Sequence, residues 1–424
     1  MSIIQKSFVI LHHHCTIGSK SAKHSLYQSI FKLKKRSKMK KLYRLDAWHQ
    51  LLALRFKSLK WRHGVLIALL ILVTLTKMIP LWGFIYTTRI YPVIGTLLSP
   101  ISGIFPFAVG DIFIALSIAW VILYPIYEIR LRKKRVFGRV AEYLLWVYAW
   151  FYIAWGLNYS QPNIYYRIGM KPVEVSKAKF KKFAYQYADS LNALSNASLS
   201  NASLCNASLS NARKNISPDS IVDDALKNRV RDAVLKEYNK IGYREGINRP
   251  FNQHPHAKTM VFTPLSSMAG VTGSMGPFFC EFTLNGDILA HDYPATYAHE
   301  FAHFLGVANE GEANFYSYIV CTASADKQVR FSGYYHIFFH VLNNVYDILG
   351  EKEGERFLKH IRPEIIQRAR NDRHYWLSKR CKALDAAQDV IFELYLRGNH
   401  VAEGRKSYSG VIGLILAWEE KIKK

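Results

Sequence analysis

The sequence predicts a mainly α-helical protein, in which three apolar helices precede a larger helical domain with a few short strands. Three apolar segments, each close to 20 residues long, follow one another between residues 64 and 157. Residues 291–424 have the pattern of consecutive helices, whereas residues 250–290 contain short apolar stretches bounded by Gly and Pro, which favour strands. Half of the 424 residues are apolar, which suits a membrane protein that also has a soluble part.

Each of the three apolar segments approaches the roughly 20 residues that a helix needs to cross a bilayer. They cover residues 64–86, 106–129 and 138–157. Basic residues cluster at 57–62, before the first segment, and at 130–135, between the second and the third. Because basic loops stay in the cytoplasm, we expect three membrane spans, a cytoplasmic N-terminus and an extracytoplasmic chain after the third span. Three buried helices of a soluble core are the alternative, which the basic clusters disfavour.

The N-terminal tail, residues 1–63, is strongly basic. It holds 15 Lys or Arg against a single acid, Asp46, in a chain whose formal net charge is +26. A basic tail can bind nucleic acid, but the sequence contains no nucleic-acid-binding motif, so we expect no nucleic-acid partner. Directly before an apolar segment, the tail is expected to face the anionic cytoplasmic leaflet of the bilayer.

Cysteine usage gives little structural information. The chain has five cysteines, an odd number, and no C-x-x-C pair, so it predicts neither a disulfide framework nor a cysteine metal site. Buried free thiols are expected, with a bridge between Cys280 and Cys321 as the alternative.

The chain after the apolar segments divides into an entry segment, a repeat and a helix. Residues 158–190 are expected to start extended and to continue as an amphipathic helix. Residues 192–212 repeat Ser-Asn-Ala-Ser-Leu with variations, and without bulky side chains they are expected to form an inserted loop. Residues 219–241 are expected to be helical, with Ser217 as the N-cap and Pro218 at the first helical position.

Residues 296–318 contain the most informative pattern of the chain. His299, Glu300 and His303 form an H-E-x-x-H motif. Residues four apart lie on the same face of a helix, so the two imidazoles can bind one ion. Glu300, one residue further round, can reach a water molecule at that ion without binding the ion itself. Two imidazoles and one carboxylate with an open fourth position describe a catalytic zinc site, in which such a carboxylate takes the proton of the attacking water.

The same stretch offers a third ligand. Gly306 can end the motif helix with a positive φ, after which the chain reaches Glu310 and Glu312. If a second helix starts at Glu310, that glutamate shares a face with Asn314, so Glu310 can bind the ion while Asn314 orients a histidine. Glu310 is the favoured ligand and Glu312 the alternative. The competing interpretation is that the two histidines only have a structural role in a core helix. The helix-ending Gly306 and the acidic start of the next helix, at Glu310 and Glu312, disfavour it.

Other residues near the motif are weaker candidates. Zinc peptidases of the zincin type hold the substrate backbone along an extended edge beside the metal helix, and residues 277–285 are expected to form that edge. Glu281 is either a support or substrate contact or a surface residue. Candidates for donors to a developing oxyanion are Tyr334, Tyr335 and His336. Further histidines that lie near the motif in sequence are His254, His256 and His291.

Residues 299–315 resemble a bacterial membrane-anchored family known as domain of unknown function 3810, whose pattern is H-E-x-A-H-x-x-G-x-A-x-E-x-E-A-N followed by an aromatic residue. The E-x-x-A-N part also resembles the E-x-x-A-D helix of gluzincin peptidases. Further blocks that resemble the family are residues 270–276, 281–285, 330–334, 395–399 and 407–411. The resemblance extends over residues 64–424, apart from the repeat, and implies a zincin-like hydrolase without naming a substrate.

The expected organisation is therefore a basic cytoplasmic tail over residues 1–63 and a three-span inner-membrane anchor over residues 64–157. An extracytoplasmic α-rich, zincin-like domain with a few short strands follows over residues 158–424. The repeat, residues 192–212, is expected to be an insert in this domain.

The expected activity is zinc-dependent hydrolysis of a peptide or protein in the cell envelope. His299, His303 and Glu310 are expected to bind Zn²⁺, and Glu300 is expected to act as the general base. Two alternatives stay open. One is a non-catalytic membrane protein in which the ion only joins two helices, and the other is a zinc amidase that acts on cell-envelope material.

Overall fold

The structure is a computed structural model that describes residues 61–132, 135–173, 176–205, 222–252, 255, 257–384, 386–390 and 410–423. The chain forms two units, Met1–Ala68 and Leu69–Lys424, and the account below concerns the second unit unless stated otherwise. Several predictions fall outside the described residues. They concern most of the basic tail, the last part of the repeat, the N-cap at Ser217 and Pro218, His254, His256, and the blocks at 395–399 and 407–409.

Two helices in the described part of the chain are long and apolar enough to cross a membrane, namely α3, Trp61–Met78, and α6, Val109–Arg130. They overlap most of the first two predicted spans, although α3 starts three residues before the first and α6 ends one residue after the second. The third predicted span is also a helix, α7, Val136–Ala154, but it does not reach the same apolarity. Arg139 and Glu142 lie in its first two turns, and its many Trp and Tyr residues lower its hydropathy further. The expectation of three spans is therefore reduced to two candidate helices.

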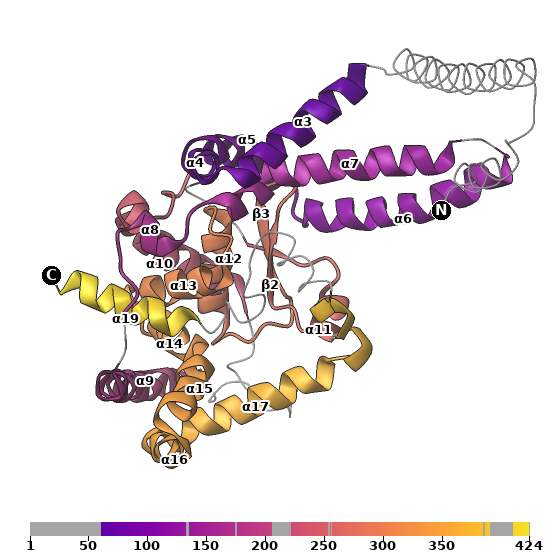
Figure 1. Ribbon diagram of the computed structural model, residues 1–424. Coiled ribbons are helices and arrows are strands. Elements are labelled where there is room, and N and C mark those ends of the chain that lie inside the picture. Colours follow the sequence, from indigo (N-terminus) through magenta and orange to yellow (C-terminus); the bar gives the residue numbers. More distant parts are fainter. Residues whose placement is uncertain are drawn as a thin grey trace, which may run out of the picture. The chain divides into compact units, whose positions relative to one another are not determined.

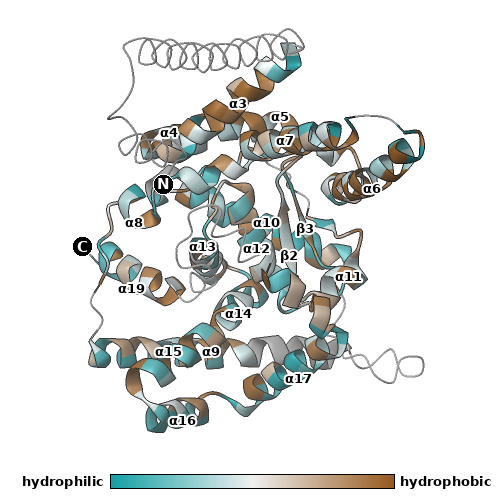
Figure 2. Ribbon diagram, turned by 45° about the vertical axis from the view of Figure 1, so that its right-hand side comes forward, coloured by the Kyte–Doolittle hydropathy of each residue, from teal (hydrophilic) through white to brown (hydrophobic). Residues whose placement is uncertain are grey.

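The segment between α3 and α6 is helical. Pro80 starts α4, Pro80–Ile85, so the first apolar helix ends at Met78 and not at residue 86. A π-helix, η1, Tyr86–Ile90, and α5, Tyr91–Gly103, follow without a break. Figure 2 shows α5 and α6 largely in the brown of apolar residues. Many of these apolar side chains are exposed; they include Val93, Leu97, Ile101, Leu116, Ile122 and Leu123.

Helices α6 and α7 run side by side (Figure 1). The hydroxyl groups of Ser117 and Tyr143 lie 2.7 Å apart, and the rings of Trp120 and Tyr143 are separated by 4.5 Å between their centres. A 3₁₀-helix, η2, Gly156–Ser160, leads from α7 into the rest of the domain. The two helices therefore form one packed pair that approaches the domain at the Val109 and Ala154 ends.

The repeat is partly helical, which corrects the expectation of a loop. After the short helix α8, Ile164–Arg167, helix α9 runs from Lys177 to Cys205 and so includes the first part of residues 192–212. The Ala, Leu and Ser residues of the repeat are tolerated in a helix, and the repeat extends a helix that has already formed. Helix α10, Asp224–Ile241, starts later than expected, because the Asp223 carboxylate caps it at the Leu226 N–H.

A small mixed sheet follows the 3₁₀-helix η4, Gly242–Glu245. Its strands are β1, Lys258–Thr259, β2, Gly273–Gly276, and β3, Glu281–Leu284, in the order β1-β3-β2. Strand β3 pairs in parallel with β1 and antiparallel with β2. The expectation that residues 277–285 form the sheet edge is wrong, since β3 is central and residues 277–280 connect it to β2. Among the described strands, β2 is the edge that lies next to α12.

The core of the domain is a group of helices beside this sheet. Helix α12, Tyr293–Phe304, is buried along its whole length and packs against β2, β3, α13, Glu310–Ala323, and α14, Lys327–His336. A cluster of aromatic rings fills the space between the sheet and α12; it includes Phe282, Tyr297, Phe301 and Phe304. Such a helix is held by side chains on all sides, so its residues have little freedom to move.

The remaining helices surround this core. They are α11, Thr263–Met268, α15, Phe338–Leu349, α16, Glu351–His360, α17, Pro363–Lys379, and α19, Val411–Ile422. Helix α19 buries its apolar residues against α13, where the rings of Trp418 and Phe315 lie 6.0 Å apart. The short apolar segment near the C-terminus therefore docks on the domain.

Candidate metal centre

The end of α12 is a tight reversal that brings two helices together. Gly306 has φ +97°, and the Val307 N–H reaches back to the Ala302 carbonyl at 3.1 Å, which confirms the expected helix end. The side chain of Asn309 then caps α13 by accepting the Glu312 N–H at 3.0 Å. The reversal places the first turn of α13 beside the last turn of α12.

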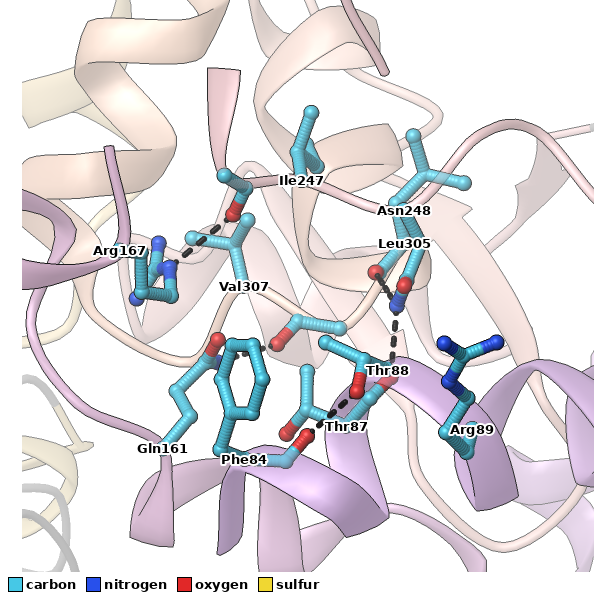
Figure 3. A pocket seen from close by; sticks show the side chains of 12 residues that line it. Phe84, Thr87, Thr88, Arg89, Gln161, Arg167, Ile247, Asn248, Leu305 and Val307 are labelled. Carbon is cyan, nitrogen blue, oxygen red and sulfur yellow. Dashed lines mark hydrogen bonds between the residues drawn. The ribbon is translucent and has the colours of Figure 1, made fainter. Parts of the chain in front are cut away.

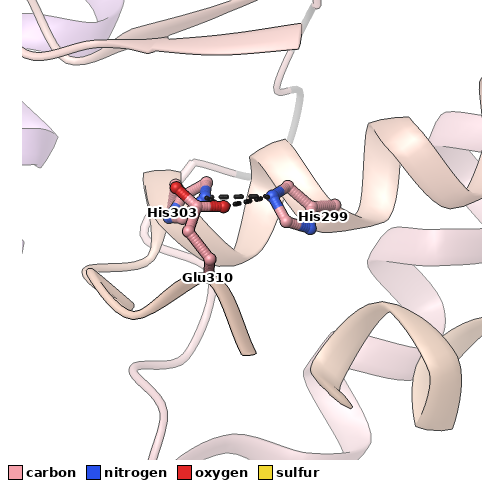
Figure 4. A group of neighbouring side chains, drawn as sticks. All are labelled: His299, His303 and Glu310. Atoms are coloured by element: carbon pink, nitrogen blue, oxygen red, sulfur yellow. Dashed lines mark hydrogen bonds and ion pairs between the residues drawn. The ribbon is translucent and has the colours of Figure 1, made fainter. Parts of the chain in front are cut away.

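Three side chains meet at this reversal (Figure 4). The His299 and His303 Nε2 atoms lie 3.1 Å apart, and the Glu310 Oε2 atom lies 3.2 Å from the first and 3.4 Å from the second. The ligands of a tetrahedral zinc ion, with bonds of 2.0–2.2 Å, are about 3.3 Å from one another. The triangle of ligand atoms therefore fits one face of such a tetrahedron, and the residues present suit the ion.

Hydrogen bonds fix the orientation of both imidazoles. The His299 Nδ1 donates to the Asn314 Oδ1 at 2.8 Å, and the His303 Nδ1 donates to the Val307 carbonyl oxygen at 2.6 Å. Both Nδ1 atoms therefore carry the protons, and both Nε2 lone pairs point at each other and at the Glu310 carboxylate. Three electron-rich atoms held this close need a positive charge between them.

The pKa values of His303 and Glu310 also indicate that a positive charge is favoured between these side chains. In the absence of an ion, the Glu310 carboxylate raises the pKa of His303 to about 9, although burial acts in the opposite direction. The two imidazoles in turn hold the pKa of Glu310 far below its usual range, again against the effect of burial. A proton occupies the place that a cation can take, so a divalent cation has to displace it.

Glu300 lies beside the triangle and does not belong to it. Its side chain is buried, its Oε2 atom has no hydrogen-bond partner among the described residues, and burial raises its pKa. A Cβ atom at Gly273 of β2 would lie 2.3 Å from the Glu300 Oε1 atom, so the glycine leaves the space that this carboxylate occupies. A buried carboxylate with a raised pKa is suited to accept and return a proton near neutral pH.

The structure separates the two glutamates that the sequence left as alternatives. Glu312 points away from the histidines and forms a buried ion pair with Arg167, with 2.6 Å between its Oε2 and the Arg167 Nη2. Its other oxygen accepts the Ile164 N–H at 2.9 Å. Glu310 is therefore the carboxylate at the cluster, and Glu312 joins α13 to α8.

The four carbonyl groups 303–306, at the end of α12 and in the turn after it, each accept a hydrogen bond from a distant side chain, and the His303 carbonyl also accepts the Gly306 N–H. The donors, in the order of the carbonyls 303–306, are Trp155 Nε1, Tyr91 Oη, Asn248 Nδ2 and Gln161 Nε2, at 3.0, 2.6, 2.9 and 2.6 Å. Sequence reasoning missed all four. No pattern in the sequence marks them, because each lies 57 or more residues from its acceptor.

Two of these donors, Asn248 and Gln161, border a cavity of about 400 Å³ that residues 305–307 also line (Figure 3). Asn248 also donates to the Thr87 carbonyl oxygen, so it joins the π-helix η1 to the turn. Gln161 reaches the Gly306 carbonyl from the segment that follows α7. The turn between His303 and Glu310 is thus held by the chain segments next to the apolar helices.

A larger cavity, of about 920 Å³, opens at the cluster itself. Its lining includes His299, Glu300, His303 and Glu310, together with residues 269–275 on the side of β2. Of the expected oxyanion donors, only His336 lines this cavity, and its Nε2 donates to Asn314 Oδ1 at 3.0 Å. Burial and the nearby His299 lower the pKa of His336 to about 3, so it is neutral at physiological pH.

The other candidates lie elsewhere. Tyr335 donates to the Asp372 carboxylate at 2.5 Å, and the ring of Tyr334 packs against Tyr318. His291 belongs to a separate group with Asp292 and Asp372, in which Arg368 lies 3.2 Å from its Nδ1. The adjacent guanidinium already supplies the positive charge there, so this group needs no metal.

Glu281 has a role that the sequence did not indicate. It is buried, and its two oxygens accept from the Gly110 N–H at 2.5 Å and from the Lys258 Nζ at 2.7 Å. It therefore binds the start of α6 to β3 and is neither a surface residue nor a contact of the metal cluster. Cys280 and Cys321 are buried free thiols, as expected.

Comparison with known proteins identifies the family and adds no activity. No curated protein and no solved structure matches the chain. The model of one family matches residues 86–416, which is more than half of the chain and includes the motif at residues 299–315 that pointed to this family. The chain belongs to the family described as protein of unknown function, DUF3810.

Proposed function

We propose that this protein is a membrane-anchored, zinc-dependent hydrolase, most simply a metallopeptidase. The observation that carries the proposal is the triangle of His299 Nε2, His303 Nε2 and Glu310 Oε2, with edges of 3.1 to 3.4 Å, at a cavity of about 920 Å³. A structural zinc site is closed by a fourth protein ligand, whereas a catalytic site keeps one position open. Within the described residues, no fourth ligand joins the group, and the cavity supplies the opening.

In this proposal, zinc bound by His299, His303 and Glu310 would polarise the scissile carbonyl and make water acidic enough to lose a proton at neutral pH. Glu300 accepts that proton as the water oxygen bonds to the carbonyl carbon. Glu300 then donates the proton to the amide nitrogen as the C–N bond breaks, so the products are a carboxylate and an amine. The buried, unpartnered Oε2 of Glu300 supports this role.

The proposed anchor consists of α3 and α6, with α7 packed against α6. The basic residues between 130 and 139 lie where α6 ends and α7 starts, and the domain joins the opposite ends of the two helices. Basic residues favour the cytoplasmic side. We therefore propose an inner-membrane protein with three helices in the membrane, a cytoplasmic N-terminus and the metal centre on the extracytoplasmic side. Its partners are the lipid bilayer and a peptide or protein in the cell envelope.

The test is a comparison of Glu300→Gln and His303→Ala with the unchanged protein. Zinc content by metal analysis and cleavage of a peptide mixture by mass spectrometry are measured together. Glu300→Gln should keep zinc and lose turnover by a factor of about 10² or more, whereas His303→Ala should lose both. Full cleavage by the Glu300→Gln protein would remove the proposed role of Glu300. Zinc retention without any cleavage by the unchanged protein would favour an ion that only joins two helices.

A further inference from the structure

The cavity at the metal centre is lined in part by the helices of the proposed anchor. Ile114 comes from α6, Phe151 comes from α7, and Trp155 directly follows α7. The other side of the cavity includes His299 and Glu300. One continuous space therefore connects the side chains that would carry out hydrolysis with apolar residues of two helices, one of which is apolar enough to cross a bilayer.

The position of Ile114 along α6 indicates how deep this space reaches. Ile114 is five residues from the Val109 end of the helix, or about 7 Å at the usual rise per residue. The 22 residues of α6 are about 33 Å long, little more than the roughly 30 Å of the hydrocarbon layer. If α6 spans the bilayer, the wall of the cavity at Ile114 lies below the membrane surface.

The edge strand β2 leads from the catalytic side chains to this wall. Gly273, at one end of β2, lies against the carboxylate of Glu300. Gly276, at the other end, lies against Gly110 at the start of α6, where a Cβ atom would be 4.0 Å from the Gly276 Cα. The two ends of the strand are separated by three residue steps, about 10 Å.

The connection between β2 and β3 is attached to the same helices. The ring of Phe278 lies 4.9 Å from that of Phe113 on α6 and 6.1 Å from that of Phe151 on α7. The Trp150 Nε1 donates to the Phe278 carbonyl oxygen at 3.0 Å. The direction of β2 relative to α6 and α7 is therefore held by aromatic packing and by a hydrogen bond.

The outer edge of β2 is unpaired in the described sheet, and a peptide backbone can add to such an edge as a further strand. We propose that the substrate is a polypeptide anchored in the same bilayer, cut about three to six residues from the point at which it leaves the membrane. The segment next to the anchor lies along β2, and the anchor packs on the side of Ile114. This inference rests on the proposed function and narrows it to one class of substrate.

The experiment compares two peptide libraries with the same randomised tail of about 20 residues. In one library the tail follows a membrane-spanning Leu/Ala helix of about 20 residues, and in the other the tail is free. The full chain, loaded with zinc, is reconstituted in phosphatidylcholine vesicles. The anchored library is reconstituted in the same vesicles, whereas the free library is added to them. Mass spectrometry maps every cut. Glu300→Gln protein serves as the blank.

The anchored library should be cut at least about tenfold faster, because the bilayer confines both molecules to one surface. Its cuts should cluster within about six residues of the helix. Equally fast cutting of the free tail, with cuts spread along it, would overturn this inference and leave the proposed function intact. Failure of the zinc-loaded protein to cut either library would remove both.

Two variants of α6 test the role of the apolar wall. Ile114→Gln places a polar group in the cavity wall and should lower the ratio of anchored to free cleavage about tenfold. Leu116→Gln is the matched control, since Leu116 is exposed on the same helix and does not line the cavity. An equal loss on both libraries for Ile114→Gln, or an equal effect of the two variants, would contradict a binding role of the wall.

Discussion

The indole Nε1 of Trp155 donates a hydrogen bond of 3.0 Å to the carbonyl oxygen of His303. Trp155 follows the last turn of α7, and His303 belongs to the cluster with His299 and Glu310. The same turn of α12 also receives Tyr91, at the start of α5. The helix that presents His299 and His303 is thus held at its end by the chain segments next to the apolar helices, so the position of these segments and the geometry of the candidate metal centre depend on each other.

Removal of the Trp155 N–H should weaken the metal centre. Trp155→Phe removes one of the two hydrogen bonds to the His303 carbonyl oxygen and leaves the one from the Gly306 N–H, so it should lower the free energy of unfolding by about 0.5–1.5 kcal/mol. The end of α12 should then be less well held, and zinc should bind about tenfold more weakly. Trp150→Phe is the matched control, because it removes an indole donor from the last turns of α7, and that donor binds the Phe278 carbonyl oxygen and not α12. Zinc titration and thermal denaturation measure both effects; equal zinc affinities for the two variants would contradict the prediction.

Substitution of Glu310 should affect zinc binding, whereas substitution of Glu312 should affect the stability of the fold. Glu310→Gln removes a ligand atom and should release zinc, while the fold without the ion is kept. Glu312→Gln breaks the buried ion pair with Arg167, so it should lower the free energy of unfolding by about 3–5 kcal/mol. The Glu312 variant, once folded, should still bind one zinc. Metal analysis and denaturant unfolding separate the two, and zinc loss in the Glu312 variant alone would reverse the assignment.

Gly273 should be required for turnover and dispensable for the metal. A methyl group there meets the carboxylate of Glu300, which is the movable end of a side chain, so Gly273→Ala should displace that carboxylate and leave the histidines in place. A displacement of about 1 Å should reduce the turnover number about 10²-fold. Gly103→Ala is the control, because a Cβ atom added at Gly103 would meet no other described side chain or segment within 4 Å. Peptide cleavage and zinc content are measured, and unchanged turnover in Gly273→Ala would place the reactive carboxylate elsewhere.

Zinc binding should release a proton from His303 at pH 7. The pKa of His303 without the ion is raised to about 9 from 6.5. The contribution of its protonation to the free energy of unfolding is therefore complete below pH 6.5 and is lost as the pH rises through about 9. The metal-free protein should therefore lose stability over this interval, while zinc affinity should rise about tenfold per pH unit. Calorimetry in buffers with different ionisation enthalpies counts the proton.

Glu310→Gln provides the control for this proton, because the carboxylate of Glu310 is the main cause of the raised pKa of His303. Proton release on any residual zinc binding should be smaller in this variant. Zinc binding to the unchanged protein at pH 7 without proton release would show that His303 is neutral before the ion arrives.

Local patterns predicted the centre of the site well. The four-residue spacing of His299 and His303 gave one helix face, Gly306 gave the end of that helix, and Asn314 was expected to orient a histidine from the face it shares with Glu310. These relations depend on the period of a helix and on the backbone freedom of glycine, which operate between neighbouring residues. The same logic failed for the sheet edge, because the choice between β2 and β3 depends on the order of the strands, in which β1 pairs with β3 and makes it central.

The sequence by itself determined a helical chain with apolar helices before a motif suited to bind an ion, because side-chain type and spacing decide those features locally. Only the tertiary structure decided that Glu310 and not Glu312 meets the histidines, that Gly273 faces Glu300, and that Trp155 holds the carbonyl of His303. Most of these contacts join segments far apart in the chain, and the choice between the two glutamates depends on how α13 packs against α12 and α8. Their partners are selected by the packing of whole helices and strands, which no short stretch of sequence specifies.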